Sequence, residues 1–405
     1  MYLRLLDKHI HHGRLHLHLP GGVHSFGNGE PEAHWFIRDR RTIARILLDP
    51  GLELGETYLD GRWTVGEGGL LPLLEILVRD FEQPGGSRIS RWFAPLWRLL
   101  QQWNRVGRSY RNVARHYDLD EWLFRHFLDR DLQYSCAYFA APDMSLEEAQ
   151  RAKCRHLMGK LLLEPGQRVL DIGCGWGGLA LFLAEHADVH VTGLTLSREQ
   201  LRVAGERARH RGLQDRVEFR LADYREHTGH YDRIISVGMF EHVGAPYHRR
   251  FMQRVSELLL PDGVAVLHTI GRSGPPSTTN SWIHRHIFPG GYIPALSEIS
   301  RALEPESLMV CDLEVLRLHY ALTLEAWLER FSTHRSTIAE RLGERFCRMW
   351  EFYLAICAAS FRWSDLVVFQ MQMAHRHHVV PTTRDYLYHP VVASSAGGIL
   401  HSVPR

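Results

Sequence analysis

VLDIGCGWGG, at residues 169–178, is the stretch that decides the fold, because an apolar strand pattern runs directly into a glycine-rich turn. Residues 168–172 predict a buried strand, and the apolar run at 179–187 predicts a helix after the turn. Glycines let the backbone turn sharply and let a ligand approach it closely. The order of strand, turn and helix therefore predicts a ligand-binding turn, although the pattern GxGxxG alone does not identify the ligand.

Further short strands and helices alternate on the C-terminal side of this turn. The predicted strands are at 189–194, 217–221, 232–237 and 264–270, and the predicted helices are at 198–210 and 248–260. Such alternation indicates an α/β fold with a mostly parallel sheet and helices on both faces. Later apolar runs at 310–322 and 366–373 are expected to add strands at one edge of the sheet.

The segment that follows the second strand argues against a nicotinamide dinucleotide. Such a site needs an acidic residue about 20 positions after the glycines, where it binds the ribose. Here the corresponding residues, 193–197, are GLTLS and include no aspartate or glutamate.

Composition describes an ordinary globular protein. The 405 residues are 45% hydrophobic and 23% charged, which excludes disorder as the main state and suggests two or three domains. The net charge of +2 gives no whole-chain signal for nucleic acid. No apolar stretch approaches the length of a membrane span, and the N-terminus does not resemble a secretory signal, so we expect a cytoplasmic protein.

A turn-rich break, PGGS at 84–87, separates an N-terminal block from the rest of the chain. Within the block, residues 43–48 and 70–78 predict helices. After it, residues 88–115 carry seven arginines and three tryptophans but no acidic residue, and 95–104 predict a helix. One interpretation is a helix that lies on an anionic membrane surface, and the other is a linker helix packed between domains. The two are compatible.

The spacing of the cysteines and histidines gives little indication of a metal centre. None of the six cysteines forms a CxxC pair, so we expect reduced thiols rather than a zinc cage. Histidines at positions 9, 11, 12, 16 and 18 could form a metal-binding tract. Because Leu15, Leu17 and Leu19 alternate with His16 and His18, we favour a strand there and expect no metal.

The string DxGCGxG at 171–177 resembles motif I of S-adenosylmethionine-dependent methyltransferases, and Asp223 with Tyr224 after the third strand strengthens the resemblance. It implies a Rossmann-like class I methyltransferase sheet. Longer strings narrow the family: YSCAYF at 134–139, LTLSREQ at 194–200, GMFEHVG at 238–244, LHTIG at 267–271, FPGGYIP at 288–294 and HYALTL at 319–324. Together they resemble the cyclopropane fatty acid synthases over about residues 109–375.

The N-terminal string LGETYLDG at 54–61 resembles the extra domain of the bacterial phospholipid enzymes of that family, which the mycolic acid enzymes lack. The resemblance therefore implies an N-terminal α+β lipid- or membrane-associated domain (1–85), a basic aromatic linker helix (86–108) and a catalytic domain (109–405). It also implies an unsaturated phospholipid as substrate, peripheral attachment to the anionic inner membrane surface, no nucleic acid partner, and a homodimer.

The resemblance implies that S-adenosylmethionine gives its methyl to a cis double bond of an acyl chain, and that a bound bicarbonate removes a proton from the resulting cation to close a cyclopropane ring. The residues that it assigns to cofactor binding are Tyr134, Ser135, Asp171, Gly173, Cys174, Gly175, Gly177, Gly178, Thr195, Gln200, Asp223 and Tyr224. Tyr224 is a mild departure, since many relatives carry tryptophan there. The residues that it assigns to catalysis are Cys136, Glu241, His268, Tyr320, the backbone of Ile270, and Cys357.

Without the resemblance, most of these residues have plainer interpretations. Glu241 follows an apolar strand at its carboxyl end, where α/β sites lie. His268 and Tyr320 could be buried strand residues, and Cys136 and Cys357 could be packing residues. Two other functions also remain open: a related lipid C-methyltransferase with a methyl-branched or methylene product, and a non-catalytic lipid-binding protein.

Overall fold

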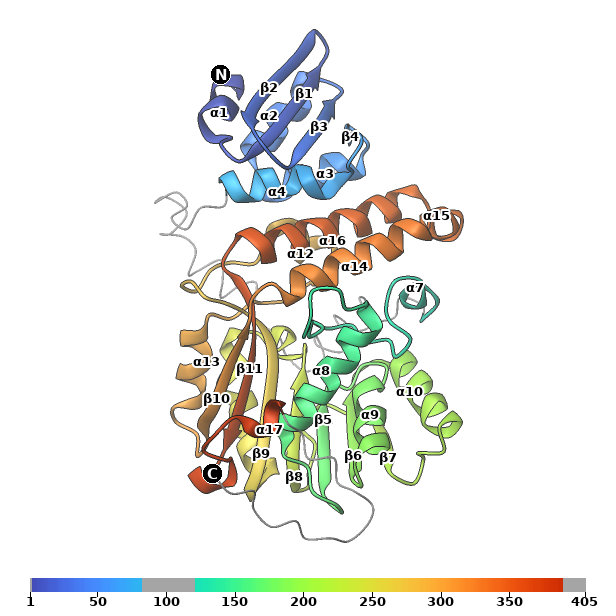
Figure 1. Cartoon of the computed structure of the whole chain (residues 1–405), viewed down its shortest axis with the longest axis vertical. Coiled ribbons are helices and arrows are strands. Elements are labelled where there is room, and N and C mark those ends of the chain that lie inside the picture. The colour runs from blue at the N-terminus through green and yellow to red at the C-terminus, as the bar shows by residue number, and fades with distance from the viewer. Residues whose placement is uncertain (1, 82–120, 389–405) are drawn as a thin grey trace.

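The computed structural model describes residues 2–81 and 121–388. The predicted break at 84–87, the basic segment with its helix, and the expected domain limits at 85, 108 and 109 lie outside the described residues. Figure 1 shows two units, with the N-terminal one above a larger α/β unit.

The N-terminal unit is a four-stranded sheet packed on helices. Its elements are α1 (Tyr2–His9), β1 (Gly13–Leu19), β2 (Gly22–Asn28), β3 (Glu32–Ile37), α2 (Arg40–Leu48), α3 (Pro50–Leu59), β4 (Trp63–Val65) and α4 (Leu70–Phe81). The strand order is β2-β1-β3-β4, and β1 and β3 run parallel. Leu15 and Leu17 are buried while His16 and His18 lie on the other face, which confirms the predicted strand.

The larger unit contains a seven-stranded sheet. Its strands are β5 (Arg168–Ile172), β6 (His190–Thr195), β7 (Val217–Leu221), β8 (Tyr231–Val237), β9 (Leu259–Arg272), β10 (Met309–Leu316) and β11 (Leu366–Ala374), in the order β10-β11-β9-β8-β5-β6-β7. The five strands from β9 to β7 are parallel, and β11 is antiparallel to both of its neighbours. This confirms the expected Rossmann-like α/β sheet with added strands at one edge.

Helices cover the sheet on both faces and at its upper end (Figure 1). They are α7 (Glu121–Arg125), α8 (Leu146–Leu161), α9 (Gly178–His186), α10 (Arg198–His210), α11 (His248–Leu258), α12 (Ser281–His286), α13 (Leu296–Leu303), α14 (His319–Thr333), α15 (Arg335–Leu342), α16 (Glu344–Trp363) and α17 (Asp385–Tyr388). Short 3-10 turns lie at Phe240–His242, Ala245–Tyr247 and His377–Val379. No helix within residues 2–81 and 121–388 is long and apolar enough to span a membrane.

The expectation of a strand over residues 310–322 is wrong in its second half. The strand ends at Leu316, and helix α14 begins at His319, so Tyr320 is a helical residue and not a strand aromatic. A short apolar run does not distinguish strand from helix. The buried positions Tyr320, Leu324, Trp327 and Phe331 follow the spacing of one helix face, which is the signal that separates the two.

The N-terminal unit packs through α3 and α4 on helices α12 and α16 (Figure 1). Arg362 of α16 pairs with Glu75 of α4 at 3.1 Å, and the guanidinium of Arg79 lies 4.1 Å from the ring centre of Trp363. Buried apolar residues of both units belong to one continuous core. Helix α16 therefore contacts the N-terminal unit through α3 and α4 and the large sheet through β11.

Candidate active site

The glycine-rich turn follows β5 at the carboxyl edge of the parallel sheet. Gly175 has a φ of +54°, and a Cβ built there would meet no atom within 4 Å, because the residue borders a cavity. Gly177 has a φ of +78°, but its Cβ would lie 2.6 Å from the ring of Phe219. Gly175 thus leaves room for a ligand, whereas Gly177 allows helix α9 to pack closely on the sheet.

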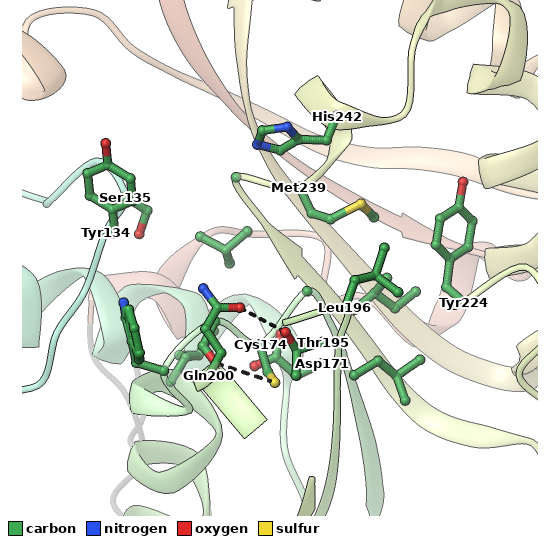
Figure 2. Close-up of a pocket in the computed structure, with 18 of the residues that line it drawn as sticks. Tyr134, Ser135, Asp171, Cys174, Thr195, Leu196, Gln200, Tyr224, Met239 and His242 are labelled. Atoms are coloured by element: carbon green, nitrogen blue, oxygen red, sulfur yellow. Dashed lines mark hydrogen bonds between the residues drawn. The ribbon is translucent and has the colours of Figure 1, made fainter. Parts of the chain in front are cut away.

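A cavity opens above this turn, and we call it the donor chamber (Figure 2). Eleven of the residues expected to bind the cofactor line it: Tyr134, Ser135, Asp171, Gly173, Cys174, Gly175, Gly178, Thr195, Gln200, Asp223 and Tyr224. Gly177, the twelfth expected residue, does not line this chamber. Met239 and His242 also line the chamber, and sequence reasoning had not singled them out.

Hydrogen bonds between side chains orient the polar groups of the donor chamber. The Thr195 hydroxyl donates to Gln200 Oε1 at 2.8 Å, which turns the amide nitrogen of Gln200 away from Thr195 (Figure 2). Asp223 accepts hydrogen bonds from the guanidinium of Arg225 at 2.9 and 2.6 Å. The chamber therefore presents an oriented amide donor and a carboxylate that is already charge-compensated.

Asp171 lies at the floor of the donor chamber, near the end of β5. It is 2% exposed, and its Oδ2 has no hydrogen-bond partner in the described part of the chain. Burial raises the pKa of this carboxyl to about 7, and the nearby Lys153 opposes the shift. A buried carboxylate with an unused oxygen is costly, so Asp171 is a group that a polar ligand would satisfy.

A second cavity adjoins the first, and we call it the reaction chamber. All six expected catalytic residues line it: Cys136, Glu241, His268, Ile270, Tyr320 and Cys357. They come from the segment before α8, the turn after β8, strand β9, and helices α14 and α16. Much of the remaining wall is apolar, and includes Ile283, Phe288, Ile293, Leu324, Phe361 and Leu366.

Glu241 is the acidic group of the reaction chamber. Its Oε1 accepts a hydrogen bond from the backbone N–H of Ile270 at 2.6 Å, and its Oε2 is buried without a partner among the described residues. Desolvation by burial raises the pKa of the carboxyl to about 7. The group can therefore hold or release a proton near neutral pH, which suits a proton-handling site.

His268 faces the same chamber in a defined tautomer. The amide nitrogen of Gln370, on the neighbouring strand β11, lies 3.1 Å from His268 Nδ1. An amide N–H can only donate, so Nδ1 accepts and the ring proton resides on Nε2. Burial lowers the pKa of His268 to about 3, so the ring is neutral. His268 is thus an uncharged donor, and Gln370 sets its orientation.

Burial also keeps the other two donors protonated. It raises the pKa of Tyr320 well above its usual value and raises that of Cys136 as well, so neither ionises at neutral pH. The Cys136 thiol donates to the carbonyl of Ala137 at 3.3 Å. Cys357 lies on α16 and is only partly buried. The raised pKa of Cys136 argues against a thiolate nucleophile at that position.

The two chambers share part of their walls, namely Tyr134, Ser135, Gly238 and His242. Lys153 supports this boundary: its ammonium donates to Ser135 Oγ at 3.0 Å and to Gln133 Oε1 at 2.5 Å, and the side chain is fully buried. Tyr134 OH and Tyr353 OH are 2.9 Å apart. Sequence reasoning missed Lys153, although the Ser145–Glu148 capping box does signal the start of its helix α8.

Comparison with known proteins agrees with this geometry. Residues 104–371 match the family model described as mycolic acid cyclopropane synthetase. The chain is 39% identical to the cyclopropane-fatty-acyl-phospholipid synthase of Escherichia coli K12 over 354 residues, which cover 85% of this chain and 88% of that protein. It is 36% identical to the tuberculostearic acid methyltransferase of Mycobacterium tuberculosis, over 91% of this chain and 89% of that protein.

Among solved structures, the cyclopropane synthase MmaA2 from Mycobacterium tuberculosis is 36% identical and superposes with a TM-score of 0.62 over 65% of this chain and 98% of its own. A coclaurine N-methyltransferase, at 22% identity and a TM-score of 0.66, shows the shared fold alone. The family match, the two-chamber geometry and these relatives lead to one conclusion: the chain belongs to the cyclopropane synthetase family of S-adenosylmethionine-dependent methyltransferases.

Proposed function

We propose that this enzyme transfers a methylene unit from S-adenosylmethionine to the cis double bond of an acyl chain in a membrane phospholipid. The observation that carries the proposal is the second chamber, an apolar cavity that holds one buried carboxylate and shares a wall with the donor chamber. A donor methyl near the shared wall would face an alkene in the apolar cavity.

The reaction has two bond-forming steps. The sulfur–methyl bond breaks as the methyl carbon bonds to one alkene carbon, and the positive charge moves to the other alkene carbon. A C–H bond of the added methyl then breaks, its electron pair closes the three-membered ring, and the proton leaves. An apolar lining excludes the water that would otherwise capture the cation.

The described residues fit a small bound anion beside the alkene. Glu241 Oε2 is an unused acceptor for an acidic hydroxyl, while His268 Nε2–H and the Tyr320 hydroxyl are neutral donors. The N–H of Ile270 already donates to Glu241, so it would reach an anion only by sharing that bond. A bicarbonate held by these groups would supply the base for the departing proton. Glu241 would hold the anion's hydroxyl and increase its basicity.

A methyl-branched product is the second candidate. It is favoured by one observation: the 36% identical relative that is named a tuberculostearic acid methyltransferase covers the N-terminal region of this chain as well as the catalytic region. The presence of the N-terminal unit therefore does not decide the product. In that alternative the cation would lose a proton from a neighbouring carbon of the acyl chain, so a double bond forms there and the added methyl keeps all its hydrogens.

The assay uses S-adenosylmethionine with a trideuterated methyl group and vesicles of unsaturated phospholipid. We expect acyl chains that gain CD₂ and resist catalytic hydrogenation, which identifies a ring. A methylene product would gain CD₂ but take up hydrogen, and a methyl-branched product would keep CD₃. Absence of any labelled acyl chain, with donor binding intact, would contradict the proposal.

We also propose that the enzyme works from the cytoplasmic side as a peripheral membrane protein and as a homodimer. Membrane attachment is supported by the arginine- and tryptophan-rich segment at 88–115, which lies outside the described residues. Each basic charge near an anionic surface contributes about 1 kcal/mol. Replacing Arg91, Arg98 and Arg105 with glutamine should therefore weaken binding to anionic vesicles without changing donor affinity. Equal vesicle binding by the triple variant would make this segment an interdomain linker.

A further inference from the structure

The outward face of the N-terminal sheet gathers three histidines and a glutamate. His16 of β1 is the register partner of His34 of β3, and Glu32 lies two residues before His34 on the same face. His16 Nε2 is 3.1 Å from Glu32 Oε1, and His34 Nε2 is 3.6 Å from the same oxygen. The side chains of His16, His34 and Glu32 are 19%, 34% and 42% exposed, so the cluster is open to solvent.

We propose that His16, His34 and Glu32 bind a divalent transition metal ion of the zinc type. This departs from our expectation that the histidine tract holds no metal. The three ligand atoms all lie within 4.8 Å of one another. A tetrahedral zinc with bonds of about 2.1 Å needs its ligand atoms about 3.4 Å apart, and the two separations from Glu32 Oε1 bracket that value.

The second nitrogen of each ring supports this assignment. His16 Nδ1 is 2.8 Å from Ser25 Oγ, and His34 Nδ1 is 3.0 Å from His18 Nε2. Metal-binding histidines commonly donate their other ring N–H to a hydrogen-bond acceptor, which leaves Nε2 with a free lone pair for the ion. A hydroxyl oxygen and an imidazole nitrogen can both accept such a bond. Both rings have this partner, and both Nε2 atoms lie on the side of Glu32.

The geometry also shows what has to change on binding. The rings of His16 and His34 are nearly parallel, with an interplanar angle of 15° and centroids 4.7 Å apart. Each ring would have to turn about its Cβ–Cγ bond to aim its lone pair at a shared ion. Three protein ligands leave the fourth position of a tetrahedral zinc to solvent. An ion here would connect strands β1 and β3 and stabilise the N-terminal sheet.

A metal-free network is the competing explanation. In it, Nε2–H groups of both rings would donate to Glu32 Oε1. The His16 distance allows such a bond, but 3.6 Å from His34 is beyond hydrogen-bond range. Both distances suit a shared ion, whereas only the shorter one suits a hydrogen bond.

The test titrates zinc chloride into the full chain after treatment with a chelator, by calorimetry at pH 7.5. We expect one site of micromolar or tighter affinity per chain, and an affinity at least about 100-fold weaker in His34→Asn, more than the loss of an outer partner causes. The matched control is His24→Asn, a histidine of β2 whose register partner is the buried Leu17, so it lies on the opposite face. That variant should bind zinc as the parent does.

Two further measurements separate this site from the thiols. Cobalt bound by two imidazoles and a carboxylate should show d–d absorption without a thiolate charge-transfer band. Zinc should raise the melting temperature of the parent but not that of the double variant His16→Asn, His34→Asn. Absence of stoichiometric zinc binding by the parent, or unchanged affinity in the double variant, would overturn the proposal.

Discussion

The donor chamber and the reaction chamber each contain one buried carboxylate with an unused oxygen, but they are built in different ways. Asp171 stands on a parallel strand, and the groups around it come from the neighbouring strand ends and the turns after them. Glu241 stands on a short turn, and its chamber is completed by helices α12, α14 and α16. The donor chamber is formed mainly at the carboxyl edge of the sheet, whereas the reaction chamber also needs the helices that lie above that edge.

This difference in construction indicates that donor binding and proton removal take place in separate parts of the site. The donor chamber places its polar groups for a ligand, while the reaction chamber surrounds Glu241, His268 and Tyr320 with apolar side chains. A substitution in one chamber should therefore change one property and spare the other. The following predictions test that separation.

Glu241→Gln should cause the largest loss. The amide cannot accept the hydroxyl of a bound anion as a carboxylate does, so we expect turnover to fall by about 100-fold or more, partly restored by added bicarbonate. The affinity for S-adenosylmethionine, measured by calorimetry, should stay within a factor of about two or three, a change of less than 1 kcal/mol. Full activity of this variant in carbonate-free buffer would remove Glu241 from proton transfer.

The two carboxylates should also make the ligand-free enzyme less stable as pH rises. The pKa of each is raised on folding to about 7, from 3.8 for Asp171 and 4.5 for Glu241. Their stability contribution is therefore fully present below the unfolded pKa and is lost as pH rises toward about 7. From pH 5 to pH 8, Asp171→Asn should lose roughly 2–3 kcal/mol less unfolding free energy than the parent.

Denaturant unfolding at the two pH values measures that difference. Asp215→Asn, at an exposed position after α10, is the control and should reproduce the pH dependence of the parent. If Asp171→Asn and the parent lose equal unfolding free energy between pH 5 and pH 8, folding does not raise the pKa of Asp171.

Gly175→Val should act on the donor chamber alone. The branched side chain enters the space that the chamber leaves open, and the positive φ adds about 1–2 kcal/mol of backbone strain. We expect affinity for S-adenosylmethionine at least about 10-fold weaker, a loss of 1.4 kcal/mol or more. Gly212→Val is the matched control, because Gly212 has a φ of +66° and equally open surroundings outside both chambers. Unchanged donor affinity in a folded Gly175→Val variant would place the donor elsewhere.

Gln370→Leu tests the tautomer of His268. Removing the amide frees His268 to place its proton on either nitrogen, so we expect turnover about 10-fold lower with donor affinity unchanged. The matched control is Gln372→Leu. Gln372 is as buried as Gln370, but its amide donates to the carbonyl of Lys160 and not to His268. If Gln372→Leu and Gln370→Leu reduce turnover and stability alike, Gln370 only supports packing.

Cys357→Ser should have the smallest effect. Direct methyl transfer needs no covalent intermediate on the enzyme, and Cys357 is one of the residues that line the reaction chamber. We expect turnover within about three-fold of the parent, less than 1 kcal/mol in the barrier. A loss comparable to that of Glu241→Gln would indicate a chemical role for the thiol.

Local sequence patterns alone predicted the strands and the turn that frame the donor chamber but not the layout of the reaction chamber, for a physical reason. The strands at 168–172 and 217–221 and the helix at 198–210 have the predicted limits, because their apolar spacing and their glycine turn are local signals. The ends of parallel strands then meet at one edge by topology. In contrast, only the family resemblance assigned Cys136, His268, Tyr320 and Cys357 to one site. Their spacing in the chain follows no strand or helix period that would group them.

The supporting residues Lys153 and Gln370 were missed because each acts on side chains that are distant in the chain. Gln370 alternates with Phe369 and Met371 on a strand buried on both faces, so its role is visible only from the register of β11 against β9. Lys153 lies on a helix of mixed polarity and would ordinarily be assigned to the surface, yet it is fully buried. The histidines of β1 acquire a partner glutamate only once β3 lies beside them.

The deuterium isotope effect on turnover tests the central claim, that the reaction chamber governs proton removal after the methyl has been transferred. Turnover of the parent and of Glu241→Gln would be compared with ordinary and trideuteromethyl S-adenosylmethionine on the same phospholipid vesicles. If Glu241 assists removal of the proton, slowing that step makes it limiting, and the variant shows a normal primary isotope effect larger than that of the parent. An isotope effect equal to that of the parent, despite a large loss of turnover, would contradict this account.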